Sequence, residues 1–200
     1  MESTTDMKKV ILLSMFLLLS CGNDKNSGSL TTTHKYLNEY LLTRDKKFLK
    51  KGYDELNRND DFNEKGITDK NREIVMPLLM YLRKYDELEK LMINYKTIDI
   101  NKKEISLNLI KSLKVNKKDK LLSKSYIDKN LKLIKGMMLK NPKDSLLYGE
   151  YFVMKLYNSD KNTVLKQIDS MQKSNKVYSS EFYDLLLKDM IKNYPKEFLY

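Results

Sequence analysis

The sequence predicts an all-α fold. From His34 onward its apolar residues recur at the three- and four-residue spacing of amphipathic helices. No convincing run alternates with the period of two that a half-buried strand would show. The segments between the apolar stripes hold three to five residues, which favours helical hairpins stacked side by side. We therefore expect stacked hairpins, either as an α-solenoid-like array or as an irregular helical bundle.

The first half of the chain contains four predicted stripes. Two short ones flank Thr43-Arg44-Asp45, and residues 57–66 (NRNDDFNEKG) are expected to form a loop because of their composition. Thr68-Asp69 predicts the cap of a third helix, and Pro77 within that helix predicts a kink or a start. The apolar members are, in order, Tyr36, Leu37, Tyr40 and Leu41; Phe48, Leu49, Tyr53 and Leu56; Ile74, Val75, Leu78, Leu79 and Leu82; and Leu88, Leu91, Met92 and Tyr95.

The second half continues in the same way. A stripe of Ile105, Leu109 and Leu113 ends before Asn116, and Asn141-Pro142 ends the long helix that follows. Residues 146–157 are apolar nearly all round, which is typical of a buried helix. Ser179 or Ser180 is expected to cap a last helix that Pro195 stops. The apolar faces expected here are Leu122, Tyr126, Ile127, Leu133, Ile134, Met137 and Met138; Val164, Leu165, Ile168 and Met171; and Tyr183, Leu187, Met190, Ile191 and Tyr194.

Residues 78–91 (LLMYLRKYDELEKL) resemble the centre of a tetratricopeptide repeat, where one helix ends in a short turn and the second begins. Asn141-Pro142-Lys143-Asp144 resembles the proline-bearing boundary between two such repeats. The chain departs from that family because Leu, Met and Tyr replace its small residues and no 34-residue period is found. The resemblance therefore implies a degenerate repeat over about two hairpins.

The N-terminal segment has a composition of a different kind. Lys8 and Lys9 precede an apolar run over residues 10–19, which suits the roughly 7–15 residues of a secretory signal. The run is shorter than the roughly 20 residues that span a bilayer. Ser20 then leads into Cys21, the only cysteine in the sequence. The acids of residues 1–6 spoil the positive start of the signal, so we expect Met7 to be the initiator.

Leu18-Leu19-Ser20-Cys21 resembles the lipobox of bacterial lipoproteins, in which these three residues before the cysteine guide the signal peptidase. The resemblance implies that Cys21 carries a diacylglycerol and becomes the new N-terminus, where its lipid holds the protein on a membrane. It also implies a place in the cell envelope, on the outer membrane if the bacterium has two membranes. The expected organisation is a signal peptide over 1–20, a lipidated and flexible tether over 21–33, and one all-α domain over 34–200.

The sequence offers little for catalysis. Its one histidine, His34, is expected on the surface at the junction of tether and domain, and no cysteine remains as a nucleophile once Cys21 is acylated. The acidic loop around Asn59 and Asp61 lacks the glycine and glutamate of a calcium-binding EF-hand. No phosphate-binding or zinc-binding motif appears. We expect no enzyme, no cofactor and no metal.

Positive charge gathers in residues 102–143, which hold thirteen lysines against Glu104, Asp119 and Asp128. Helical spacing places Lys124, Lys132 and Lys135 opposite the apolar face of one helix. This basic face could meet anionic lipid headgroups or an acidic protein, or it could be a solvated surface. Nucleic acid is not an expected partner, because the chain is predicted to be exported and its basic residues are lysines rather than base-reading arginines.

Two classes of function follow. The first is a membrane-anchored helical module that binds another protein in the cell envelope. The alternative is an envelope solute-binding protein or enzyme with a pocket among its helices.

Overall fold

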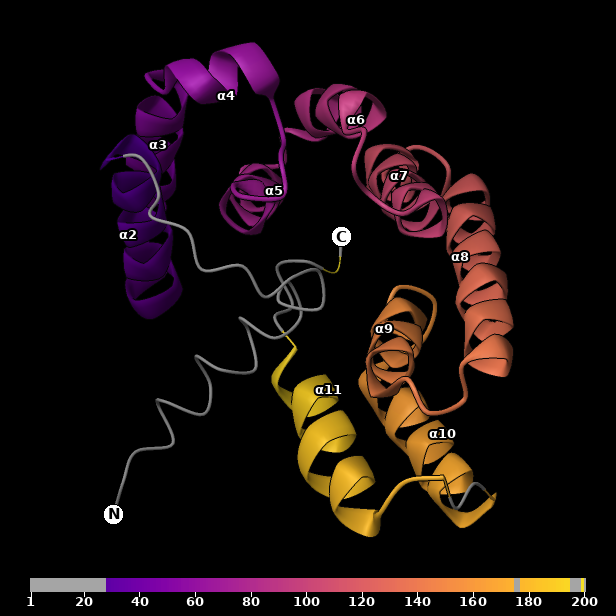
Figure 1. Cartoon of the computed structure of the whole chain (residues 1–200). Helices are drawn as coiled ribbons and strands as arrows, with labels where there is room; N and C mark the ends of the chain where they lie inside the picture. Colours follow the sequence, from indigo (N-terminus) through magenta and orange to yellow (C-terminus); the bar gives the residue numbers. More distant parts are fainter. Residues whose placement is uncertain (1–27, 175–176, 195–198, 200) are drawn as a thin grey trace, which may run out of the picture. The chain divides into compact units, whose positions relative to one another are not determined.

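The computed structural model describes residues 28–174, 177–194 and 199, and every regular element within these ranges is a helix (Figure 1). The predicted all-α fold is confirmed, and the described residues include no strand. The chain divides into two compact units, with the boundary between Lys114 and Val115. The helices are α2 (Gly28–Thr43), α3 (Lys46–Asn57), α4 (Asp60–Lys65), α5 (Arg72–Tyr81), α6 (Tyr85–Asn94), α7 (Ile100–Val115), α8 (Lys120–Lys140), α9 (Ser145–Lys155), α10 (Lys161–Ser174), η1 (Phe182–Lys188) and α11 (Asp189–Asn193).

The first unit begins with a helical hairpin, in which α2 and α3 lie side by side (Figure 1). The predicted stripes supply its core, since Leu37 of α2 and Leu49 and Leu56 of α3 are buried. Gly52 lies on the inner face of α3, where an added Cβ would be 3.4 Å from the Cβ of Tyr36. The added atom would therefore be in ordinary van der Waals contact, and Gly52 lies where the two helices pack.

Two hairpin turns in this unit share an uncommon backbone conformation. Arg44, between α2 and α3, has φ 59°, and Arg83, between α5 and α6, has φ 56°. Left-handed backbone costs a residue with a Cβ roughly 1–2 kcal/mol, and glycine usually occupies such a position after a helix. The Arg83 turn lies within residues 78–91, where the structure has a helix, a turn and a second helix.

Two sequence expectations in this unit are wrong in detail, and one of the two alternatives at Pro77 is excluded. Residues 57–66 do not form a loop throughout, because Asn59 caps a short helix by accepting a hydrogen bond from the Phe62 amide (2.8 Å) and Phe62 is buried. The third helix begins at Arg72 after Asn71 rather than at Thr68-Asp69, so Pro77 is in its interior and does not start it.

The predicted tether also needs correction at its C-terminal end. Helix α2 begins at Gly28, so residues 28–33 are helical instead of flexible, and Leu30 and Thr33 are buried. Apolar Leu30 lies seven residues before Leu37, which puts both on one face of the helix. The predicted signal peptide and the rest of the tether lie outside the described residues.

The second unit begins with the long helix α8, which packs against α9. Its buried stripe consists of Ser123, Ile127, Asn130 and Ile134. The expected apolar face is therefore confirmed at Ile127 and Ile134, but it is too wide, since Leu133 is only half-buried and Leu122 is 41% exposed.

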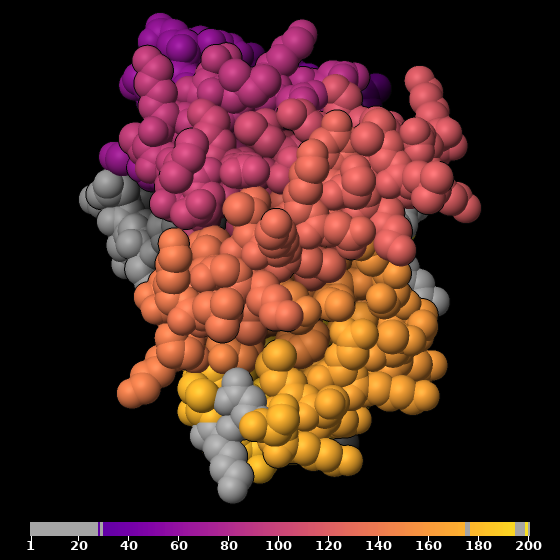
Figure 2. Space-filling view, turned by 90° about the vertical axis from the view of Figure 1, so that its right-hand side faces the viewer, coloured from indigo at the N-terminus to yellow at the C-terminus, as the bar shows by residue number. Residues whose placement is uncertain are grey.

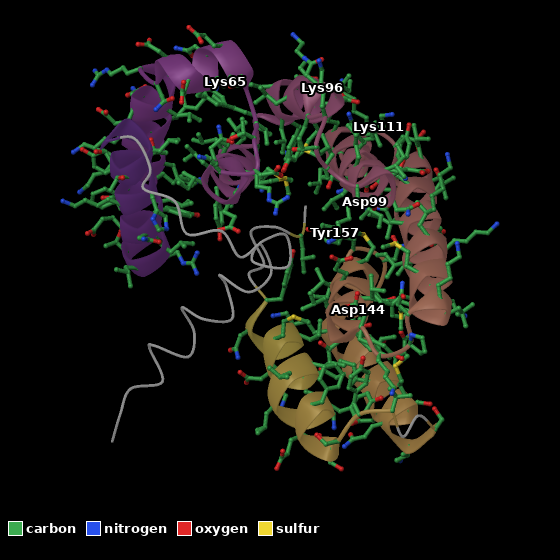
Figure 3. All side chains as sticks on the ribbon, viewed as in Figure 1. Lys65, Lys96, Asp99, Lys111, Asp144 and Tyr157 are labelled. Carbon is green, nitrogen blue, oxygen red and sulfur yellow. The ribbon has the colours of Figure 1, made fainter. Side chains whose placement is uncertain are left out.

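Helix α9 is capped at its N-terminus by Asp144, whose carboxylate accepts a hydrogen bond from the Leu146 amide (3.0 Å). Figure 3 labels Asp144 beside α9. The prediction of a buried helix is confirmed for its main face, which includes Tyr148, Phe152 and Val153. Leu146 is an exception because it is exposed in the first turn.

The last predicted helix is interrupted in its backbone pattern. Ser179 accepts a hydrogen bond from the Phe182 amide (3.4 Å), as expected of a cap. The following residues form the π-helical segment η1 and only then the short α-helix α11. The expected inward residues Tyr183, Leu187 and Ile191 are buried, and the Tyr157 and Tyr194 hydroxyl oxygens lie 3.1 Å apart.

Candidate functional site

The residues that the sequence predicts to be functional fall into two groups, one for lipid attachment and one that forms a basic face. Cys21 and the three residues before it, Leu18, Leu19 and Ser20, lie outside the described residues. Lys124, Lys132 and Lys135 all lie on α8, and all three are exposed. The structure therefore gives a geometry to the second group, and the site can be built from this helix.

One face of α8 consists entirely of exposed residues, and we call it the α8 face. Its members recur every three or four residues, so they fall within an arc of about 80° around the helix axis. They are Leu121, Lys124, Asp128, Lys132, Lys135 and Leu139. Figure 3 shows side chains with nitrogen tips on the side of α8 away from α9. The buried stripe of the same helix occupies a separate arc, so Lys124, Lys132 and Lys135 face solvent as predicted.

The two leucines at the ends of the α8 face are unusually exposed. The exposed fraction is 82% for Leu121 and 79% for Leu139. The two residues are 18 positions apart, which corresponds to about 27 Å along an α-helix. Sequence reasoning missed them, because it assigned every leucine of this helix to the buried side or left it unplaced. The face thus has three lysines and one aspartate, with an apolar residue at each end.

The lysines of the α8 face make no ion pair with another described residue. Asp128 is the one acid among them, and its carboxylate accepts a hydrogen bond from Nδ2 of Asn158 (2.8 Å). The nearest acid in sequence, Asp119, caps the helix by accepting a hydrogen bond from the Leu122 amide (2.8 Å). Both acids are thus engaged with groups of the fold, and neither carries an ion pair to these lysines.

The charge of the second unit is divided unevenly along the chain. Residues 115–143 contain nine lysines and two acids, whereas residues 144–200 contain eight lysines and eight acids. The whole net charge of this unit therefore belongs to α8 and its flanking residues. In Figure 2, long side chains project from the surface in the colours of this segment.

A second polar cluster lies in the first unit, around the start of α5. Arg72 is buried and donates a hydrogen bond to the hydroxyl of Tyr95 (3.1 Å), which in turn donates to the carboxylate of Asp69. This hydrogen bond from Tyr95 is the main cause that holds the pKa of Asp69 below its usual value, while burial raises the pKa of Tyr95. A tyrosine with a raised pKa is harder to ionise, which disfavours its use as a base or nucleophile. The cluster ties the turn before α5 to the residue after α6.

The remaining candidates for a functional site are His34, a metal site and a membrane-spanning helix. His34 is exposed on the second turn of α2, with its Nε2 atom 3.4 Å from Nδ2 of Asn38, so it belongs to a helix and not to a tether junction. Within the described ranges, no three or more His, Cys, Asp or Glu side chains are grouped so that they could hold a metal ion. Among the described helices, none combines the length and the apolar character needed to cross a bilayer. Comparison of the chain with protein-family models, curated proteins and solved structures finds no match.

Proposed function

We propose that this chain is a bacterial envelope lipoprotein, anchored through acylated Cys21, whose all-α part is a protein-interaction module. The observation that carries the proposal is the sequence KKVILLSMFLLLSC, in which a basic start, a short apolar run and a small residue precede the only cysteine. No feature of the described residues competes with this signal in specificity.

The start of α2 bears on how such an anchor would act. Gly28, the first residue of α2, lies seven positions after Cys21. A fully extended chain of this length spans at most about 24 Å. An acylated Cys21 would therefore keep the first helical hairpin within that distance of the lipid headgroups. A flexible tether that reached to residue 33 would allow a larger distance.

The interaction role is supported by the kind of surface that the fold provides. Helical hairpins, here with a tetratricopeptide-like turn at Arg83, present extended helix faces. Partner proteins commonly bind to such faces. The polar cluster of Arg72, Tyr95 and Asp69 closes on itself through hydrogen bonds. It is therefore better explained as part of the fold than as a site of chemistry.

The anchor is tested by replacing Cys21. In the wild-type chain, an alkynyl fatty acid should label the protein and the signal should be removed just before Cys21. Cys21→Ser should abolish labelling and leave the precursor uncut at this position. Ser20→Thr is not a useful control, because Ser20 is one of the predicted recognition residues. The control is Ser27→Ala, which lies outside these residues and should be labelled normally. Labelling that persists in Cys21→Ser would contradict the proposal.

The interaction role is tested on the detergent-extracted protein. We expect a defined protein to co-purify in constant ratio and to cross-link to surface lysines of the helical part. A chain that purifies alone, with a small molecule detected by mass spectrometry after denaturation, would favour the alternative of a solute-binding protein.

A further inference from the structure

We propose that the α8 face is a membrane-contacting surface that binds anionic lipid headgroups. The proposal rests on the proposed anchor, because Cys21 would bring the protein to a bilayer. The α8 face would then add a second contact and restrict how the protein lies on it. The surface carries Lys124, Lys132 and Lys135, with Asp128 among them, between Leu121 and Leu139.

Charge complementarity is the first argument for this partner. The three lysines are exposed and make no ion pair with another described residue, so their charge is available to an outside anion. Residues 115–143 supply seven net positive charges in a single stretch of chain. The surface of an anionic bilayer attracts such clusters, and each lysine near it strengthens binding about fivefold.

The choice of basic residue favours lipid over protein. The last arginine of the chain is Arg83, so the second unit and the whole α8 face are basic through lysine alone. Protein interfaces are enriched in arginine and aromatic residues and are depleted in lysine. The α8 face has no arginine and no aromatic residue, and this argues against an acidic protein as its main partner.

The arrangement of the leucines fits a flat surface. Leu121 and Leu139 share an arc with the lysines and lie about 27 Å apart along the axis, so a bilayer that meets the lysines also meets both leucines. Lysine side chains can keep the charged end at the phosphates while their methylene stems pass along apolar groups. The leucines would then enter the boundary between headgroups and acyl chains, as the apolar residues of interfacial helices do.

The first test measures vesicle binding by the chain from residue 22 onward, made without lipid; it contains every described helix. Vesicles of equal parts phosphatidylglycerol and phosphatidylcholine should bind it, and salt should weaken the binding. Vesicles of phosphatidylcholine alone should bind it poorly. Replacing Lys124, Lys132 and Lys135 together by Gln should weaken binding on the order of a hundredfold.

A matched control separates this surface from net charge in general. Lys166 and Lys173 of α10 and Lys192 of α11 are also exposed and belong to the same unit. Replacing these three by Gln removes the same number of charges and should reduce binding much less. Equal losses in the two triple variants would overturn the proposal, because binding would then follow total charge.

The second test uses the absence of tryptophan from the sequence. Leu139→Trp introduces a single fluorophore on the α8 face, and anionic vesicles should shift its emission to the blue. Leu186→Trp places the fluorophore on the exposed side of η1, and its emission should change little. A shift of equal size at both positions, or no shift at Leu139→Trp, would overturn the proposal.

Further outcomes separate the lipid surface from an acidic partner and from the anchor. If polyglutamate shifts the Leu139→Trp emission and anionic vesicles do not, the surface binds acidic protein and the lipid assignment is wrong. If vesicles bind the unlipidated chain while Cys21 takes no fatty acid, the anchor fails and the α8 face stands. If Cys21 is labelled and vesicles do not bind the unlipidated chain, the anchor stands and the α8 face is overturned.

Discussion

Lysines in the second unit are used in two different ways. On α8, Lys124, Lys132 and Lys135 are exposed and make no ion pair with a described residue. In contrast, Lys188 of η1 is only 18% exposed, and its Nζ atom lies 2.6 Å from a carboxylate oxygen of both Asp169 and Asp184. It also donates to Oε1 of Gln172 (3.1 Å). The same residue type thus joins two helices in one place and covers an open surface in the other.

The difference follows from where acids occur in the sequence. Eight acids accompany the eight lysines of residues 144–200, and two of them, on α10 and η1, reach Lys188. The two acids of residues 115–143 are used for a helix cap and for a hydrogen bond from Asn158. A lysine becomes part of the fold where another group supplies an acceptor. For Lys188 the acceptors are carboxylates, and for Lys161 they are the backbone carbonyls of Lys192 and Tyr194 (both 2.9 Å).

The largest expected effect concerns the opposite side of α8. Ile134 is fully buried, so Ile134→Ala should lower the free energy of unfolding by roughly 2–5 kcal/mol. Leu133→Ala should cost clearly less, because Leu133 is half-buried. Urea denaturation of both variants gives the comparison. Equal losses would mean that the buried stripe of α8 is wider than Ser123, Ile127, Asn130 and Ile134.

A smaller effect is expected at the paired lysine. Lys188→Met keeps the aliphatic stem but removes both ion pairs and leaves two carboxylates close together, so it should cost about 1 kcal/mol of unfolding free energy. Lys166→Met on the exposed side of α10 is the matched control and should change stability by only a few tenths of a kcal/mol. A Lys188 variant as stable as the control would show that the pairs add nothing measurable.

The same pairs predict a pH dependence with a definite sign. Hydrogen bonding from Lys188 lowers the pKa of Asp184, and hydrogen bonding to Asp169 and Asp184 raises the pKa of Lys188. The carboxylate contribution should be complete above the ordinary pKa of about 4 and be lost as pH falls below it. The ammonium contribution should be complete below about pH 10 and be lost above it. Thermal melts over this range should show both losses in the wild type and weaker ones in Lys188→Met.

The smallest effect on stability is expected on the α8 face. Exchanging Lys124, Lys132 and Lys135 together for Gln should shift the unfolding free energy by only a few tenths of a kcal/mol, because exposed charges contribute little. Relief of repulsion among the lysines could even make the change favourable. A loss of several kcal/mol in calorimetry would contradict the placement of this face in solvent and would remove the basis for its binding role.

Much of the fold could be predicted from helical spacing. Leu78, Leu79 and Leu88 belong to predicted stripes, and all three are fully buried. The short helix α4 could not be predicted from composition, because Asn59 and Gly66 are also common in loops. What forms the helix is the cap at Asn59 together with burial of Phe62, and composition alone does not show that a residue is buried.

The sequence predicted which lysines of the α8 face are exposed, but it did not predict which leucines are. The exposure of Lys124, Lys132 and Lys135 follows from their spacing alone. Helix α8 carries more apolar residues than one neighbour can cover, and spacing does not say which of them meet α9. Asn130 and Ser123 are buried there, while Leu121 and Leu139 are exposed. Only the packing of the two helices decides between these arrangements.

The π-helical segment η1 bears on how this chain tolerates changes in its length. A π-helical turn holds more residues than an α-helical turn. A single deletion within η1 can therefore convert it to α-helix, while the buried residues of α11 stay on the same side. The same deletion in the middle of α8 would rotate every later residue by about 100°. Ile134 would then leave the buried stripe, and the α8 face would be broken in two. The segment η1 can therefore lose a residue at a smaller cost in stability than α8 can, and length variation among related chains should concentrate in η1.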